Sequence, residues 1–232
     1  MGQLVAESLR LYGARFWPSL ALGIGPAVVS IGLVALPRPY EWALVPTVGV
    51  VLWSAAYCGA CRLAHDADGP VRVAFVAGCI AFLPLLVQRI VVLPGFDLIT
   101  LAFFAFTCLA VPASLVERRS LGDTLRRAVQ LARADYVHAL GSLAALVITI
   151  FLSGLVLVLL LHGLSDQAIR VAAVIAVLLL SPVFLLGAAL LYLDQAARVV
   201  ESAPRTRRRR NADVHPALEP DAAGRADAEV EP

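Results

Sequence analysis

Two cysteines and a histidine stand at a spacing that could hold a metal ion. Cys58, Cys61 and His65 follow one another at positions i, i+3 and i+7, so on a helix they share one face. Thiolate sulfurs and imidazole nitrogens are the usual ligands of zinc, but a structural zinc site has four ligands, and no second closely spaced cysteine pair follows. Cysteine and glycine here also suit close contacts between membrane helices. The incomplete ligand set favours helix packing, with a metal or redox role as the alternative.

A second group of residues could act inside a membrane. An ionisable residue within an apolar run is a candidate for substrate or ion binding. Arg89 lies near the end of its run, so its guanidinium could instead reach the lipid headgroups, and Asp97 is placed to pair with it. Glu117 ends another run and is followed by two arginines, which predicts ion pairs at the membrane interface. The candidate intramembrane polar residues are Gln88, Arg89, Asp97 and Glu117.

The sequence lacks the short motifs of several enzyme classes. It contains no His-Glu-x-x-His zinc helix, no Gly-x-Ser-x-Gly elbow, no Walker A loop and no Gly-x-Gly-x-x-Gly fingerprint. No acid lies at the centre of an apolar run, where proton relays place their carboxylates. We therefore expect a non-enzymatic protein with no cofactor and no nucleic-acid partner. An enzyme acting on lipid headgroups through Glu117, His65 or Asp66 is kept as an alternative.

The composition indicates that most of the surface faces a solvent other than water. Hydrophobic residues make up 60% of the 232 residues and charged residues 16%, whereas soluble domains average about 45–50% and about 25%. A membrane crossing takes about 20 apolar residues. The apolar runs are residues 18–36, 42–63, 73–93, 98–116, 137–161 and 171–193. We predict an all-α, polytopic bundle of about six transmembrane helices, or five if the run that Arg89 interrupts is re-entrant.

Arginine placement predicts how the spans are oriented. All 19 basic residues are arginines, and cytoplasmic flanks of membrane helices are enriched in such residues. With six spans, 16 arginines fall on the side that holds both termini, and only Arg38, Arg89 and Arg170 fall on the other. We therefore expect a multi-pass protein of the cell membrane with both termini in the cytoplasm.

Two segments outside these runs have the pattern of amphipathic helices. Residues 3–16 and 120–136 each carry one apolar face, and the second places Arg126, Arg127 and Arg133 opposite it. A serine followed by an acid in the first turn predicts an N-cap at the start of the second helix. This helix either lies in the headgroup plane with its arginines toward lipid phosphates, or extends the following transmembrane helix into the cytoplasm.

The last part of the chain has no apolar periodicity. Residues 196–232 are rich in proline, alanine and acids, which predicts a disordered cytoplasmic tail. An arginine cluster lies at its start, where each arginine gains roughly 1 kcal/mol from anionic lipid. The candidate lipid-binding residues of this cluster are Arg205, Arg207, Arg208, Arg209 and Arg210.

Polar residues also mark the ends of the last two apolar runs. Asp194 and Glu201 follow the sixth run and are expected to pair with the arginine-rich helix at 120–136. His138 and His162 bracket the fifth run, a placement that fits anchoring at the interface better than catalysis.

Two stretches of the sequence carry a family resemblance. Residues 8–22 form an entry segment, and residues 111–141 combine a run-ending Glu117 with the amphipathic helix at 121–135. This pattern resembles the membrane domain of glycerophosphoryl diester phosphodiesterases and of related bacterial multi-pass proteins. The resemblance implies a helical membrane domain with cytoplasmic interfacial helices over residues 4–195. It does not imply hydrolysis, because the catalytic domain of those enzymes is a separate soluble barrel.

These observations together give a domain plan and an expected function. Residues 1–17 form an amphipathic interfacial helix, residues 18–195 a six-span domain that includes the helix at 120–136, and residues 196–232 the tail. We expect a lipid-facing scaffold or partner subunit that contacts the bilayer, anionic phospholipid headgroups, and a membrane protein or a second copy of itself. A small transporter or permease subunit is the main alternative.

Overall fold

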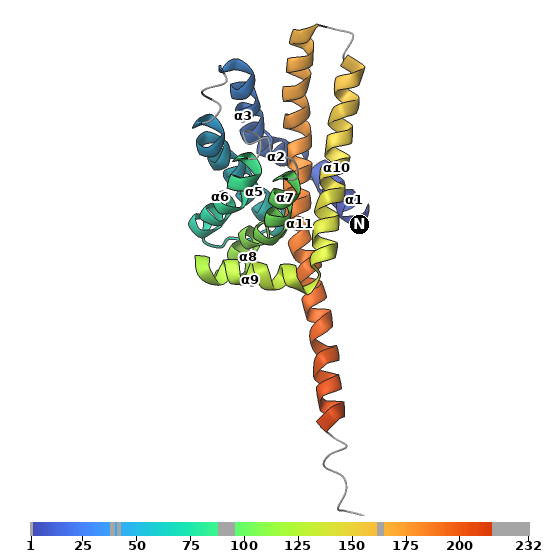
Figure 1. Cartoon of the computed structure of the whole chain (residues 1–232). Coiled ribbons are helices and arrows are strands. Elements are labelled where there is room, and N and C mark those ends of the chain that lie inside the picture. Colours follow the sequence, from blue (N-terminus) through green and yellow to red (C-terminus); the bar gives the residue numbers. More distant parts are fainter. Residues whose placement is uncertain (1, 38–39, 41–42, 88–95, 162–164, 215–232) are drawn as a thin grey trace, which may run out of the picture.

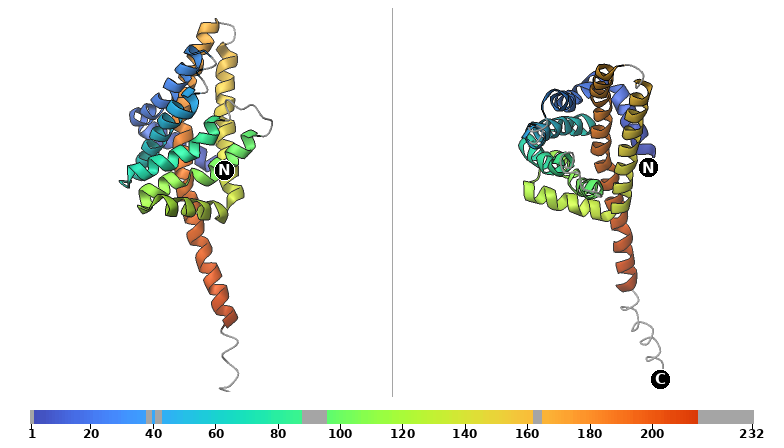
Figure 2. Two further views of the ribbon diagram at one scale, coloured as in Figure 1. Left: turned by 60° about the vertical axis from the view of Figure 1, so that its left-hand side comes forward. Right: turned by 45° about the horizontal axis from the view of Figure 1, so that its top comes forward.

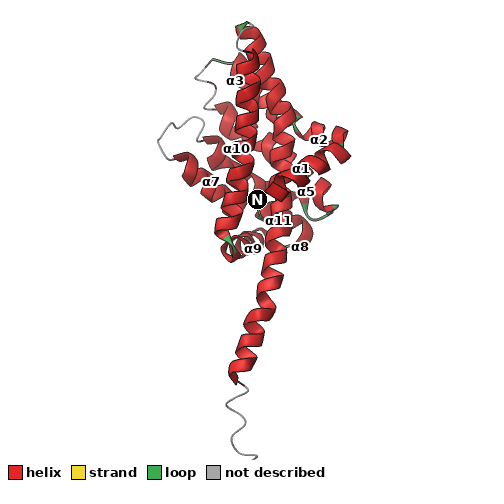
Figure 3. Ribbon diagram, turned by 90° about the vertical axis from the view of Figure 1, so that its right-hand side faces the viewer, coloured by secondary structure: helices red, strands yellow, loops and turns green. Residues whose placement is uncertain are grey.

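The computed structural model describes residues 2–37, 40, 43–87, 96–161 and 165–214, and over these residues every regular element is a helix (Figure 3). This confirms the predicted all-α class. The elements are α1 (Gly2–Ala14), α2 (Phe16–Leu22), α3 (Ile24–Ala35), the π-helix η1 (Val45–Gly49), α5 (Val50–His65), α6 (Val71–Val87), α7 (Phe96–Thr107), α8 (Ala110–Glu117), α9 (Leu121–Ala134), α10 (Tyr136–Leu161) and α11 (Asp166–Val214).

Five stretches of helix within the described residues are long and apolar enough to cross a membrane. They are Phe16–Ala35, Val45–His65, Leu98–Glu117, Tyr136–Leu161 and Gln167–Val199. The remaining run, predicted at 73–93, corresponds to the shorter apolar helix α6. Gln88 and Arg89 lie outside the described residues. Figures 1 and 3 place the start of α7 well below the far ends of α10 and α11. Five spans are thus present by length, and α6 is the short partner of α7.

Helix α11 is the axis of the bundle. It contacts α1, α2, α3, α5, α8, α9 and α10. Helices α10 and α11 form a long antiparallel hairpin, and the other helices pack on its sides (Figures 1 and 2). Helix α9 runs across one end of the bundle, transverse to α10 and α11 (Figure 1). We call this end the α9 end and the opposite one the hairpin end.

Prolines interrupt the hydrogen bonding of several spans and leave carbonyl groups free for other contacts. Proline has no N–H for the carbonyl four residues earlier. Pro112 therefore frees the carbonyl of Cys108, which accepts a hydrogen bond from the buried Tyr57 hydroxyl at 2.9 Å. The span is divided into α7 and α8 at this point. A side chain from α5 thus satisfies the backbone where α7 and α8 meet, as membrane helices require.

The core of the bundle consists of small residues around a group of aromatic rings. Trp53, Tyr57, Phe82, Phe104 and Phe184 contact one another with ring centroids 5.1–6.4 Å apart. The fully buried alanines around them include Ala60, Ala74, Ala77, Ala81, Ala105, Ala113, Ala188 and Ala189. Small residues let membrane helices approach closely, so this composition favours close packing of the helices.

Two open grooves lie on the outside of the bundle. One, of about 630 Å³, lies between η1, α5 and α6, and the other, of about 530 Å³, lies near the hairpin end of α10 and α11. No acidic or basic side chain lines either groove. Their apolar walls suit contact with lipid chains and not the passage of a polar solute.

The prediction of a disordered tail from residue 196 is wrong for its first part, because α11 continues as a helix to Val214 and projects beyond the α9 end (Figure 1). Residues 196–203 are mainly alanine, valine, arginine and glutamate, and adding residues to an existing helix costs less than nucleating a new one. The arginine cluster at 205–210 therefore lies on a helix. Residues 215–232 lie outside the described part of the chain.

Candidate functional site

Glu117 is the centre of one polar cluster at the α9 end. Its carboxylate accepts a hydrogen bond from Arg127 Nε at 3.0 Å and another from the Tyr192 hydroxyl at 3.1 Å. Arg119 Nε forms a further ion pair with it at 2.6 Å. Only 17% of the Glu117 side chain is exposed, so these contacts are weakly screened by solvent. This cluster joins α8, α9 and α11.

Local backbone geometry brings the partners of Glu117 together. Arg118 ends α8 in the left-handed conformation, with φ 51°, and turns the chain toward α9. Ser120 then caps α9: its hydroxyl oxygen accepts from the Asp123 N–H at 3.4 Å and donates to the Asp123 carboxylate at 2.7 Å. The predicted N-cap is confirmed, and from this start Arg127 reaches back to the end of α8.

His65 joins the same cluster through Tyr192. Its ring packs edge-on against the Tyr192 ring at 5.7 Å, and His65 Nε2 lies 3.1 Å from the carbonyl oxygen of Ala189. Because a carbonyl only accepts, His65 Nε2 carries the proton, and His65 Nδ1 is buried without a hydrogen-bond partner among the described residues. Cys58 and Cys61 are buried in the core, and no group of three His, Cys, Asp or Glu side chains in the described part of the chain could hold a metal ion. The contacts of Cys58, Cys61 and His65 are those of residues that pack α5 against neighbouring helices.

The alternative of chemistry on lipid headgroups named Glu117, His65 or Asp66 as its residues. Glu117 and His65 both contact Tyr192, but Asp66 forms an ion pair with Arg15 at 3.3 Å on the surface. The structure therefore assembles two of the three residues. Arg62 and Asp68 form a second surface ion pair at 3.0 Å. Exposed pairs of this kind contribute about 0–1 kcal/mol each.

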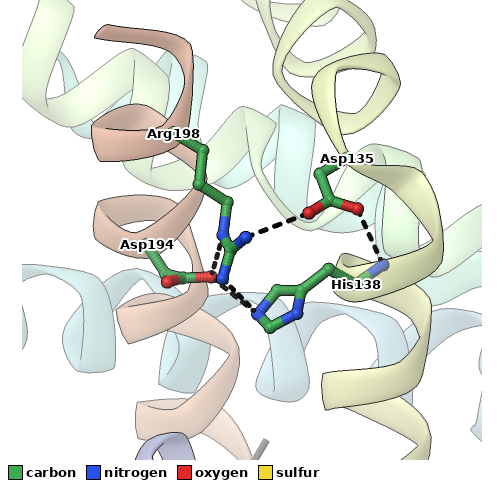
Figure 4. A network of polar contacts seen from close by, with 4 residues as sticks. All are labelled: Asp135, His138, Asp194 and Arg198. Atoms are coloured by element: carbon green, nitrogen blue, oxygen red, sulfur yellow. Dashed lines mark hydrogen bonds and ion pairs between the residues drawn. The ribbon is translucent and has the colours of Figure 1, made fainter. Parts of the chain in front are cut away.

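Arg198 is the centre of a second polar cluster, shown in Figure 4. It donates to Asp135 Oδ2 at 3.0 Å and to Asp194 Oδ2 at 3.1 Å, and its Nη2 lies 3.0 Å from His138 Nε2. His138 Nε2 also lies 3.1 Å from Asp194 Oδ2. Asp135 further caps α10, accepting from the His138 N–H at 3.2 Å. The cluster ties the junction of α9 and α10 to α11.

Helix α9 is separate from the transmembrane helix that follows it. The helix is interrupted at Asp135, which has a non-helical backbone with a φ of −152°, so α9 is not an extension of α10. The buried face of α9 consists of Thr124, Ala128, Leu131 and Ala132. This face packs on α6, α7, α8 and α11, so in this structure the protein itself covers the apolar side of α9.

The predicted lipid-binding arginines have different environments. Arg126 and Arg133 are exposed on α9, whereas Arg127 is engaged by Glu117. The structure describes only the backbone of the 205–210 cluster and of Asp97, and not their side chains. Arg89, the predicted partner of Asp97, lies among the undescribed residues, so that pair stays a prediction.

At the α9 end most acids have a partner within the protein, whereas several arginines do not. Six described acids on this side have a polar partner: Asp66, Asp68, Glu117, Asp123, Asp135 and Asp194. Five exposed arginines form no ion pair with any residue that the structure describes, Arg10, Arg72, Arg118, Arg126 and Arg133, against one exposed acid without a described partner, Glu7 of α1. This end therefore presents positive charge that its own carboxylates do not neutralise.

The Arg198 cluster differs from the pairing predicted for Asp194. The sequence suggested that Asp194 would meet the arginines of the 120–136 helix, but its partner is Arg198, one turn along the same helix. The i, i+4 spacing of Asp194 and Arg198 is a sequence signal for this pair. Nothing in the spacing links them to Asp135, since 63 residues separate Arg198 from it.

Comparison with known proteins identifies no relative: no family model, no curated protein and no solved structure matches the chain.

Proposed function

We propose that this chain is a non-enzymatic scaffold or partner subunit of the cell membrane, and that its α9 end binds anionic phospholipid headgroups at the cytoplasmic face. The observation that carries the proposal is the unneutralised charge of the α9 end. Five exposed arginines on this side form no ion pair with a described residue, whereas only one described acid there, Glu7, lacks a partner. Arginine binds phosphate oxygens in a fork geometry that suits lipid headgroups.

The orientation follows from the same residues. In the predicted six-span topology, 16 of the 19 arginines fall on the side of α9, and cytoplasmic flanks are the ones enriched in arginine. Helix α11 extends the positive charge further, since residues 205–210 lie on its projecting end. Juxtamembrane arginines gain roughly 1 kcal/mol each from an anionic leaflet.

The interior of the bundle supports a scaffold over a transporter. Small residues and aromatic rings fill the core, and the two grooves on the outside have apolar walls. A transporter would need polar groups converging near the middle of the membrane. Interaction with a membrane protein or with a second copy of the chain stays part of the proposal.

Lipid binding by two arginine variants tests the proposal. The full chain in mild detergent is titrated with phosphatidylglycerol or phosphatidylcholine, and bound lipid is counted by native mass spectrometry. Arg126→Gln and Arg133→Gln should each weaken phosphatidylglycerol binding about fivefold, the factor that corresponds to roughly 1 kcal/mol per arginine.

Arg170→Gln is the matched control, because Arg170 is exposed at the hairpin end. It should leave phosphatidylglycerol binding at the α9 end unchanged. Equal binding of the two lipids by the wild-type chain, or unchanged binding after both α9 substitutions, would contradict the proposal.

A further inference from the structure

Helix α9 is a rigid element between two non-helical joints. At its start, Arg118 has a left-handed backbone and Ser120 an extended one. At its end, Asp135 has a φ of −152° and separates it from α10. Rotation about these joints would move α9 without breaking any helical hydrogen bond within it, which is how hinged elements move as units.

Two polar clusters hold α9 against the bundle, one through Arg127 at its middle and one through Asp135 at its C-terminal end. Arg127 binds Glu117 of α8 at 3.0 Å, and Asp135 binds Arg198 of α11 at 3.0 Å. The apolar residues between them are mostly small: Ala128, Leu131 and Ala132. Leu121 and Leu125 pack partly buried against the same core, and the two clusters fix how α9 lies on it.

Buried polar atoms without partners lie on α9 and on the segment of α11 between the two clusters. Gln195 is fully buried on α11, three residues after Tyr192 and three before Arg198, and thus between the two clusters. Neither its amide nitrogen nor its amide oxygen has a hydrogen-bond partner in the described part of the chain. The hydroxyl of Thr124, on the buried face of α9, is buried and unpaired in the same way. Buried polar groups of this kind destabilise the arrangement that buries them.

We infer that α9 is a strap that an anionic membrane surface opens. In the closed state Arg127 is bound to Glu117; in the open state a lipid phosphate replaces Glu117 as its partner. Water reaches Gln195 and Thr124, and the apolar face of α9 turns into the headgroup region, as amphipathic helices do. This inference rests on the proposed binding of anionic lipid and adds a regulated movement to it.

Reactivity of a cysteine on the covered face of α9 tests the strap. Ala128 is 1% exposed, so Ala128→Cys reports on opening. The full chain is reconstituted in phosphatidylcholine vesicles with or without phosphatidylglycerol and treated with N-ethylmaleimide, which reacts with thiols in water and in the headgroup region. Modification is followed peptide by peptide, and the buried Cys61 and Cys108 serve as internal controls for global unfolding.

Phosphatidylglycerol should raise the rate of modification at position 128 and leave Cys61 and Cys108 protected. Glu117→Gln or Arg198→Gln should raise it about tenfold even without that lipid, the change expected when a charge-assisted hydrogen bond is lost from a local opening equilibrium. Gln195→Leu should lower it, because it removes the two unpaired atoms from the closed state. Asp68→Asn, which breaks a surface pair away from α9, should have no effect.

Three results would overturn the strap: no response to either cluster substitution, reaction of all three cysteines together, or a response to the substitutions but none to phosphatidylglycerol. Lipid binding measured by native mass spectrometry is independent of this readout. Retained phosphatidylglycerol binding with no change at position 128 would therefore remove the strap and leave the proposed function standing.

Discussion

At the residue scale, two prolines determine how spans contact their neighbours. Pro112 leaves the carbonyl of Cys108 to the Tyr57 hydroxyl. Pro182 in the same way leaves the carbonyl of Leu178 without an intrahelical donor, and this oxygen lies against Gly23, where α2 meets α3. The prolines could be read from the sequence as kinks. Their partners could not, because they come from helices distant in the chain.

The Tyr57 hydroxyl has a measurable role in this arrangement. Tyr57→Phe leaves the Cys108 carbonyl buried without a donor and should lower the free energy of unfolding by about 1–3 kcal/mol. Denaturant unfolding in detergent, followed by circular dichroism, measures the change. Tyr40→Phe is the matched control, since Tyr40 is 60% exposed and should tolerate the loss of its hydroxyl. Equal stability of the two variants would show that the hydrogen bond contributes nothing.

Gly23 should tolerate no side chain. A Cβ at this position would overlap the carbonyl oxygen of Leu178, and backbone atoms cannot move aside as a flexible side chain can. Gly23→Ala should therefore destabilise the bundle by about 1–3 kcal/mol, as overpacking does. At Gly13 a Cβ would meet nothing within 4 Å. There alanine should be neutral or stabilising, because it favours the helix. Melting temperatures of the two variants in one detergent should separate, and a coincident pair would contradict the account.

At the element scale, α9 shows which predictions follow from local sequence and which depend on packing. Its existence, its N-cap and its arginine face follow from local sequence, and the structure contains them. The coverage of its apolar face by the bundle, and the binding of Arg127 by Glu117, depend on how the spans pack. The same limit applies to the end of α11. Local composition suggested a disordered tail, but an established helix extends into its first part, as far as Val214.

Arg198 is the residue on which the joint between α9, α10 and α11 depends most. Its removal leaves Asp135 and Asp194 without the guanidinium that both contact, in a setting where each of these side chains is only 36–37% exposed. Arg198→Ala should lower the free energy of unfolding by about 1–3 kcal/mol. Arg62→Ala, which breaks an exposed pair with Asp68, should cost less than about 1 kcal/mol. A larger loss for Arg62→Ala would reverse this ranking of the two sites.

At the scale of the whole molecule, charge and hydropathy determine the arrangement. Five of the six predicted apolar runs correspond to helices that are long enough to cross a membrane. The run at 73–93 is described only as far as Val87, the last residue of α6, so whether it forms a full span stays a prediction. The asymmetric placement of arginine in the sequence predicts that the α9 end faces the cytoplasm, and both the lipid proposal and the strap depend on that predicted assignment.

Labelling from either side of the membrane tests that assignment most directly. Gln130 lies on the exposed face of α9 and Gln167 near the hairpin end, and both are exposed. Each is changed to cysteine in the full chain, and cells or inverted membrane vesicles are treated with a membrane-impermeant maleimide, with the wild-type chain as background. Gln167→Cys should react in intact cells, and Gln130→Cys only in inverted vesicles. Reaction of Gln130→Cys in intact cells would place the α9 end outside the cell and contradict the account.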